Sequence, residues 1–194
     1  FSLAVTLPRA GNLGGGGFML VYLKESDEIF YIDYRSKSPL NSNLENIFDI
    51  INNTGKPYVT VPKDFDYDLF DVLDEGYKAS ALPGTVAGLL DAHSRFGKLT
   101  LKEVLTPVIK QASEGIVVSY DLYKAIESTP RLLKDPESKR IYFKNNKPIK
   151  ENSILKLPDL AQTISLIAEN GKDGFYKGVT AKKIDQAMKN NNGL

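Results

Sequence analysis

The chain has 194 residues, of which 42% are hydrophobic and 25% charged. This composition is typical of one globular domain and excludes a disordered tail, a collagen-like rod or a membrane protein as the main interpretation. Lys plus Arg is 25 and Asp plus Glu is 24, so the net charge of +1 gives no electrostatic reason to expect nucleic acid or an anionic membrane as partner. The chain contains no cysteine and one histidine, His93, which excludes disulfides, thiolate metal centres, a cysteine nucleophile and a multi-histidine metal site within it.

The two ends of the sequence resemble interruptions. Residues 1–7 (FSLAVTL) form an apolar run without the basic leader of a signal peptide, and the run is far shorter than the roughly 20 residues that span a bilayer. It is typical of the last part of a helix or strand. The final residues 188–194 (MKNNNGL) indicate a helix end followed by a turn. We therefore expect both ends to be cuts in a longer protein.

Residues 17–34 predict a β-hairpin. Residues 17–24 are almost continuously apolar, residues 29–34 are rich in β-branched and aromatic side chains, and a polar turn of hairpin length separates them. Continuous apolarity predicts that the first strand is buried on both faces, with layers above and below. Residues 41–75 show weak periodicity, and we expect a long connection there with one short strand at 58–61.

Helical periodicity begins at Pro83. The spacing of apolar residues predicts a helix that ends at Gly97 and a second helix that ends at Gly115. Thr100 and Glu103 form a capping-box pattern at the start of the second helix.

Three further helices are expected. One is capped by Ser119 and runs to about Glu127; another starts at Pro158 and ends at Gly171. Between them, the charged and proline-marked residues 129–152 predict a loop with a short extended piece at 141–143. The last helix carries Ala181, Ile184 and Met188.

This order of elements predicts an α+β or layered α/β fold in which amphipathic helices cover a core of strands. We treat residues 1–194 as a single partial domain, with a strand-rich portion over 1–82 and a helical portion over 83–194.

Four successive glycines precede the first predicted strand: Gly14, Gly15, Gly16 and Gly17. Such a run is costly in chain entropy, so the backbone there must need the absence of side chains. The loop either lies where no Cβ fits or offers backbone N–H groups to an anion, and close packing is the simpler of these two interpretations. A nucleotide-binding loop is not indicated, because a strand follows the glycines and no lysine does.

Arg35 follows the second predicted strand. A guanidinium at the end of a rigid strand can grip a carboxylate with two parallel hydrogen bonds, although most strand-end arginines are solvated. Asp33 would share its face of the strand and either pairs with Arg35 or faces water.

The other candidates have simpler explanations. His93 lies on the apolar stripe of its helix, where packing is the usual role, and the charged run 134–140 is typical of a solvated loop. Four aromatic residues lie at helix-like positions and are expected in the core or an interface: Tyr120, Tyr123, Phe175 and Tyr176.

Several blocks of the sequence closely resemble the large subunit of γ-glutamyltranspeptidases. The specific ones are 14–22 (GGGGFMLVY), 31–35 (YIDYR) and 82–89 (LPGTVAGL). Supporting blocks follow in the same order at 157–161 (LPDLA), 174–178 (GFYKG) and 192–194 (NGL). The resemblance therefore covers essentially the whole chain.

The resemblance implies an N-terminal-nucleophile hydrolase with a four-layer αββα sandwich, made as a precursor that cleaves itself. A threonine at the start of the small subunit would attack the γ-glutamyl amide of glutathione, with its own α-amino group as the base. The acyl group would pass to water, an amino acid or a peptide. No cofactor or metal is implied.

The same resemblance implies partners and location. The expected partner is the small-subunit portion of the same precursor, and the substrates are glutathione and other γ-glutamyl compounds, with no nucleic acid and no membrane contact in this segment. A periplasmic or extracellular location is implied. Since the nucleophilic threonine is not in this chain, we expect the chain by itself to be inactive.

One family residue matches a position here: the arginine that binds the α-carboxylate of the γ-glutamyl group corresponds to Arg35. Just beyond it the family usually reads Arg-Glu-x-Ala-Pro, whereas residues 35–39 read Arg-Ser-Lys-Ser-Pro. Ser36 in place of the glutamate alters the local support of the arginine, and Lys37 adds a positive charge.

Two alternatives stay open on the sequence. One is a related amidohydrolase of the same superfamily, such as a cephalosporin-acylase-like enzyme or a capsule depolymerase. The other is a non-catalytic packing module, in which Arg35 would be tied up by Asp33 or lie far from any cleft.

Overall fold

The computed structural model describes residues 1–40, 42 and 76–193. The chain divides into two compact units. The first comprises Phe1–Leu13 and Leu89–Tyr176, and the second comprises Gly14–Gly88 and Lys177–Leu194. The predicted connection over 41–75, with its short strand at 58–61, lies outside the described residues apart from residue 42.

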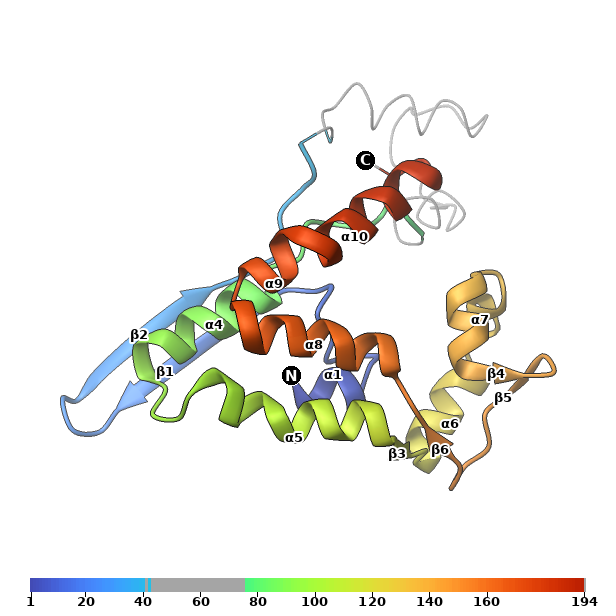
Figure 1. Cartoon of the computed structure of the whole chain (residues 1–194), viewed down its shortest axis with the longest axis horizontal. Coiled ribbons are helices and arrows are strands. Elements are labelled where there is room, and N and C mark those ends of the chain that lie inside the picture. The colour runs from blue at the N-terminus through green and yellow to red at the C-terminus, as the bar shows by residue number, and fades with distance from the viewer. Residues whose placement is uncertain (41, 43–75, 194) are drawn as a thin grey trace, which may run out of the picture. The chain divides into compact units, whose positions relative to one another are not determined.

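The second unit contains the predicted hairpin (Figure 1). Strand β1 (Phe18–Leu23) pairs antiparallel with β2 (Glu28–Asp33), in a register that sets Phe18 opposite Asp33. The turn between them places Asp27 in the left-handed region at φ 54°, and the Tyr22 hydroxyl donates a hydrogen bond to its carboxylate at 3.0 Å. The unit also contains α10 (Gly178–Asn190) and the start of α4 (Thr85–Phe96).

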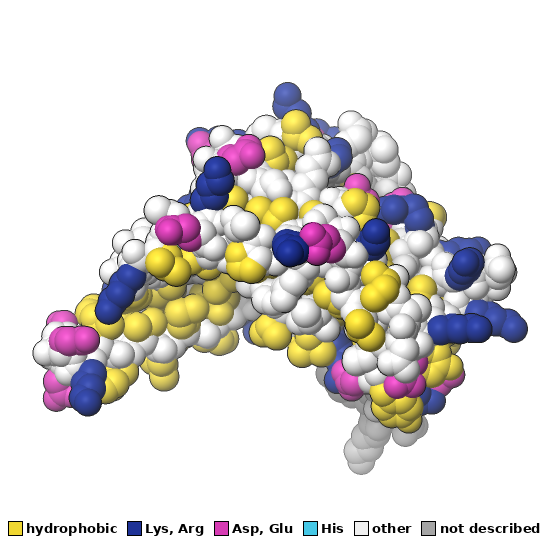
Figure 2. Space-filling model, turned by 60° about the horizontal axis from the view of Figure 1, so that its bottom comes forward, with side chains coloured by type: hydrophobic (Ala, Val, Ile, Leu, Met, Phe, Trp, Pro, Cys, Tyr) yellow, Lys and Arg dark blue, Asp and Glu magenta, His cyan; other side chains and the backbone are white. Residues whose placement is uncertain are grey.

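One face of this hairpin is exposed. Side chains alternate between the two faces of a strand, and one set is more than half exposed; we call it the apolar hairpin face. Burial of β1 on both faces was therefore a wrong prediction for this chain, because the described residues cover only the opposite side, where Ile32 is buried. Figure 2 shows hydrophobic side chains gathered along the hairpin. The apolar hairpin face comprises Phe18, Leu20, Tyr22, Ile29 and Tyr31.

The core of the first unit lies between α5 (Leu101–Glu114) and α8 (Pro158–Asn170), which pack along each other (Figure 1). Both helices present apolar residues at three- and four-residue spacing toward this contact. The fully buried side chains of the pair include Leu105, Ile164 and Ile167.

Local signals explain where the helices begin and end. At the start of α5, Thr100 and Glu103 form the predicted capping box, in which the Thr100 Oγ1 accepts the Glu103 N–H and the Glu103 carboxylate accepts the Thr100 N–H. At the start of α6 (Tyr120–Glu127), the Ser119 hydroxyl oxygen accepts the Leu122 N–H at 3.1 Å. These predicted helices are confirmed.

The prediction of a loop over residues 129–152 is wrong. This segment holds a 3₁₀ helix η1 (Pro130–Leu133), helix α7 (Pro136–Tyr142) and a small hairpin of β4 (Phe143–Lys144) and β5 (Lys147–Pro148). Asp135 caps α7 by accepting the Ser138 N–H at 2.6 Å, and Pro136 occupies the first helical position. The charged run 134–140 is therefore mostly helical.

The remaining elements complete the first unit. Gly115 ends α5 with φ 104°, and Gly171 ends α8 with φ 58°, both in the region that favours glycine. Among the described residues, no helix is both long enough and apolar enough to cross a membrane. The other elements are α1 (Ser2–Thr6), β3 (Ile116–Val117), which pairs with β6 (Ile154–Leu155), and α9 (Asp173–Tyr176).

Candidate functional site

Arg35 stands between two backbone pairings in the second unit. It follows β2, and two residues later Lys37 forms an isolated bridge with Leu82. The Lys37 N–H donates to the Leu82 carbonyl at 3.0 Å, and the Leu82 N–H donates to the Lys37 carbonyl at 2.7 Å. The chain on both sides of Arg35 is therefore held by hydrogen bonds.

The glycine block is tied to the same segment. Gly17 and Tyr34 exchange both backbone hydrogen bonds, with N···O distances of 3.0 and 3.3 Å. The Gly15 carbonyl accepts the N–H groups of Gly84 and Thr85 at 2.8 and 3.0 Å, which satisfies donors at the start of α4. Three segments distant in sequence thus meet around residues 34–37.

Close packing explains why glycine occupies these positions. A Cβ on Gly16 would lie 2.7 Å from the Tyr34 carbonyl oxygen, and a Cβ on Gly84 would lie 2.9 Å from the Tyr34 carbonyl carbon. Neither glycine has a left-handed backbone, so the reason is the approach of another main chain. For Gly16, this is the first of the two explanations expected for the glycine block.

The guanidinium of Arg35 is not tied up by Asp33. The Asp33 carboxylate instead accepts the backbone N–H of Arg35 at 2.9 Å. The Arg35 side chain is exposed, and within the described part of the chain it takes part in no ion pair or side-chain hydrogen bond. Its backbone is therefore fixed, while none of the residues that the structure describes pairs with its guanidinium.

The residues that depart from the family pattern lie beside it. The Ser36 backbone nitrogen packs against Gly16, and Lys37 is exposed. Arg35 is exposed as well, so two cationic side chains lie two residues apart in the sequence. The local charge is therefore more positive than the family pattern implies, which suits an anionic ligand.

The single histidine has a structural role. His93 is half-buried on α4, and its Nε2 lies 2.9 Å from the Leu99 carbonyl oxygen beyond the end of that helix. A Cβ on Gly97 would lie 2.7 Å from the His93 Cδ2. The ring thus packs into the turn that follows the helix, as the packing interpretation expected.

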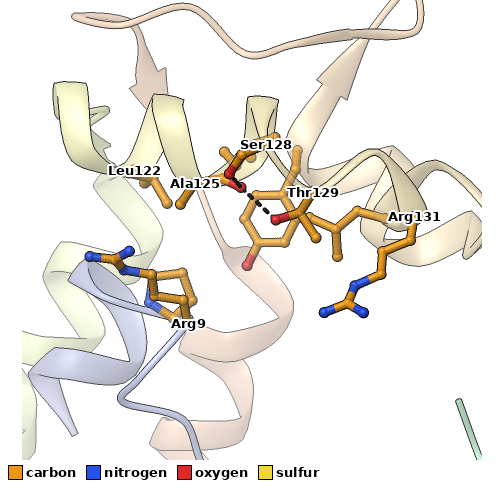
Figure 3. A pocket seen from close by; sticks show the side chains of 10 residues that line it. Arg9, Leu122, Ala125, Ser128, Thr129 and Arg131 are labelled. Carbon is orange, nitrogen blue, oxygen red and sulfur yellow. Dashed lines mark hydrogen bonds between the residues drawn. The ribbon is translucent and has the colours of Figure 1, made fainter. Parts of the chain in front are cut away.

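A pocket of about 360 Å³ lies in the first unit, between the segment after α1 and the helices α6, η1 and α7 (Figure 3). Arg9 and Arg131 contribute to its lining, and the Thr129 hydroxyl there donates to the Ala125 carbonyl at 2.7 Å. Arg9 is already paired with Asp121 at 2.9 Å. The pocket is not lined by Arg35 or the glycine block. Across the described ranges, no three His, Asp or Glu side chains gather as a metal site would require.

Three residues of this region were not singled out from the sequence. Tyr34, Gly84 and Gly88 all lie against one another or against the Arg35 backbone. A signal for the two glycines was present in the block 82–89 (LPGTVAGL), which contains them at a four-residue spacing.

Comparison with known proteins matches the whole chain to one protein family. The family model described as Gamma-glutamyltranspeptidase matches residues 1–194. The "Glutathione hydrolase proenzyme" of Escherichia coli (strain K12) is 37% identical over 196 residues, which cover 100% of this chain and 31% of that protein.

Solved structures of gamma-glutamyltranspeptidases are also similar to this chain. The crystal structure of Helicobacter pylori gamma-glutamyltranspeptidase has a TM-score of 0.86 at 32% identity, and covers 100% of this chain and 52% of that chain. The gamma-glutamyltranspeptidase from Pseudomonas nitroreducens complexed with L-DON has a TM-score of 0.81 at 36% identity, with 100% and 52% covered.

These matches define a mixed helix-and-sheet protein with the fold of the γ-glutamyltranspeptidases, which confirms the fold class expected from the sequence. The chain belongs to the gamma-glutamyltranspeptidase family. It spans 31% of the length of the Escherichia coli relative.

Proposed function

We propose that the protein containing this chain cleaves the γ-glutamyl amide of glutathione and related compounds, and transfers the acyl group to water, an amino acid or a peptide. In this proposal Arg35 binds the α-carboxylate of the γ-glutamyl group. Family membership over all 194 residues supports the reaction class, as does the printed name of the relative, glutathione hydrolase.

The observation that carries the role of Arg35 is a guanidinium that no described residue neutralises, on a backbone held by hydrogen bonds. A planar guanidinium matches a carboxylate with two parallel hydrogen bonds, which a lysine ammonium does not reproduce. The Asp33 carboxylate is occupied by a backbone N–H, so it leaves the guanidinium available to a ligand.

The rest of the enzyme would supply the chemistry. The family resemblance assigns the nucleophile to a threonine at the start of a small subunit, released when the precursor cleaves itself. The apolar hairpin face supports such a partner, because exposed apolar surface of this kind marks an interaction site. A periplasmic or extracellular location is part of the same proposal.

Substitution of Arg35 tests the assignment. In the intact enzyme, Arg35→Ala should raise the KM for a γ-glutamyl anilide about 10- to 150-fold, since a hydrogen bond to a charged group contributes about 1.5–3 kcal/mol. Arg35→Lys should recover only part of this loss, because it keeps the charge but not the fork. Steady-state kinetics with the purified enzyme would measure both effects.

Arg9→Ala is the matched control. Arg9 is also an exposed arginine, but it belongs to the first unit and is paired with Asp121. Its removal should leave KM within twofold of the wild type, as expected for a surface ion pair. Equal KM values for the wild type and Arg35→Ala would remove the carboxylate-binding role.

A further inference from the structure

Tyr34 lies at the centre of the contacts around Arg35. It is the residue between the end of β2 and Arg35, and its side chain is half-buried. Its backbone N–H and carbonyl are both bonded to Gly17. It therefore extends the hairpin ladder by one residue and fixes the direction in which the chain enters Arg35.

Glycines surround the Tyr34 ring on two sides. A Cβ on Gly17 would lie 3.0 Å from both Cε2 and the hydroxyl oxygen of Tyr34. A Cβ on Gly88 would lie 2.5 Å from Cδ1 and closer still to Cβ and Cγ. Since real Cβ atoms do not approach this closely, the ring occupies space that only glycine at position 88 leaves open.

Two more glycines contact the main chain of the same residue. Gly16 and Gly84 both approach the Tyr34 carbonyl within a distance that a Cβ would not permit. Ring and carbonyl are thus held from the hairpin side by residues 16 and 17, and from the helix side by residues 84 and 88. We call this arrangement the Tyr34 clamp, defined by Tyr34, Gly16, Gly17, Gly84 and Gly88.

The backbone of Arg35 is held by the Asp33 carboxylate and by the Lys37–Leu82 bridge, and Tyr34 fixes the backbone immediately before it. Its side chain makes no ion pair in the described ranges, so the position of its guanidinium depends on how its backbone is held, and Tyr34 contributes to that hold through both of its backbone hydrogen bonds to Gly17. We propose that Tyr34 is a positioning residue for Arg35, held in place by the four glycines. This inference rests on the proposed role of Arg35 in binding a γ-glutamyl carboxylate.

A double-mutant cycle in the intact enzyme tests whether Tyr34 acts through Arg35. Tyr34→Ala should raise the KM for a γ-glutamyl anilide roughly tenfold or more, with a smaller change in kcat, because a displaced guanidinium weakens carboxylate binding. In the Arg35→Ala background, the same Tyr34→Ala substitution should leave KM unchanged within twofold.

Tyr34→Phe is the conservative variant. It keeps the ring that the glycines enclose and removes only the hydroxyl, so KM should return to within twofold of the wild-type value. Tyr120→Ala, at an exposed tyrosine of the first unit, should change neither KM nor kcat.

A milder substitution covers the case in which Tyr34→Ala does not fold. Gly17→Ala brings a methyl group to 3.0 Å from Cε2 and the hydroxyl oxygen of Tyr34, and it should raise KM in the wild type but not in the Arg35→Ala background.

The outcomes separate this proposal from the one on which it rests. If Tyr34→Ala and Arg35→Ala raise KM by independent factors that multiply in the double variant, the positioning role is overturned while Arg35 keeps its assignment. If Arg35→Ala alone leaves KM unchanged, the proposed function of Arg35 fails first.

Discussion

Asp33 lies two residues before Arg35 but does not pair with its guanidinium. A carboxylate two residues from Arg35 would neutralise the guanidinium if the two side chains met. Instead its Oδ1 accepts the backbone N–H of Arg35 at 2.9 Å, a local bond that Asp and Asn side chains commonly make. The acid therefore stabilises the backbone at Arg35 and leaves the head group free of it.

Substitution of Asp33 tests whether this hydrogen bond contributes to binding of the γ-glutamyl donor. Asp33→Ala removes the acceptor and should raise the KM for a γ-glutamyl donor about two- to tenfold, the scale of one hydrogen bond of about 0.5–1.5 kcal/mol. Asp33→Asn keeps a side-chain oxygen at the same place and should stay near the wild type. Equal effects of the two variants would assign the role to the charge.

The glycines show why parts of the site could not be predicted from the sequence. Four successive glycines indicated that side chains were excluded, and close packing was the simpler explanation. The partners of that packing were not visible, because Gly16 meets residues 34–36 and Gly84 meets Tyr34 across long stretches of sequence. Such contacts require tertiary structure, whereas the strand-end position of Arg35 could be read from the pattern of the strand.

At the scale of single elements, local signals decided the helix boundaries. The capping box at Thr100 places two hydrogen bonds on the Glu103 carboxylate, and these bonds lower the pKa of Glu103 below its ordinary value. A carboxyl whose pKa is lower in the folded state stabilises that state above the unfolded pKa, and this stabilisation is lost as pH falls through the folded pKa.

The capping box therefore predicts a pH-dependent effect of Glu103→Gln. The variant should melt below the wild type at neutral pH, and the difference in Tm should vanish as the pH falls below the ordinary glutamate range. Glu114→Gln, at the exposed other end of α5, is the matched control and should show a smaller difference at neutral pH. A Glu103→Gln difference that persists at acid pH would contradict the role of the charged form.

The short elements between residues 129 and 152 were not predicted from the sequence. The seven residues of α7 are too few to show apolar periodicity, and their charges suggested a solvated loop. The start signal was nevertheless present, as Asp135 followed by Pro136. Longer helices such as α5 and α8 repeat their apolar spacing over several turns, which is why they could be predicted with their ends.

At the scale of the whole molecule, the apolar hairpin face is a group of neighbouring hydrophobic side chains that the described residues leave exposed. Leu20 is 72% exposed, although it lies in the strand whose continuous apolarity predicted two-sided burial, and Ile29 of the paired strand is 71% exposed. The prediction was wrong for the described residues, which leave this face exposed. We expect the remainder of the enzyme to cover it.

This expectation can be tested in the intact enzyme. Leu20→Ser should lower its free energy of unfolding by about 1.5–3 kcal/mol, the scale for burying one leucine side chain. Lys24→Ser, at the exposed end of the same hairpin, should leave Tm nearly unchanged. Thermal unfolding of the two variants side by side would check this, and an unaffected Tm for Leu20→Ser would mean that the face stays open.

The most direct test of the central claim is a crystal structure of the intact enzyme with bound L-glutamate. The account predicts that the glutamate α-carboxylate accepts two hydrogen bonds from the Arg35 guanidinium, with N···O distances of about 2.7–2.9 Å. Tyr34 should remain enclosed by Gly17 and Gly88. A glutamate whose α-carboxylate is held elsewhere, with Arg35 facing solvent, would contradict it.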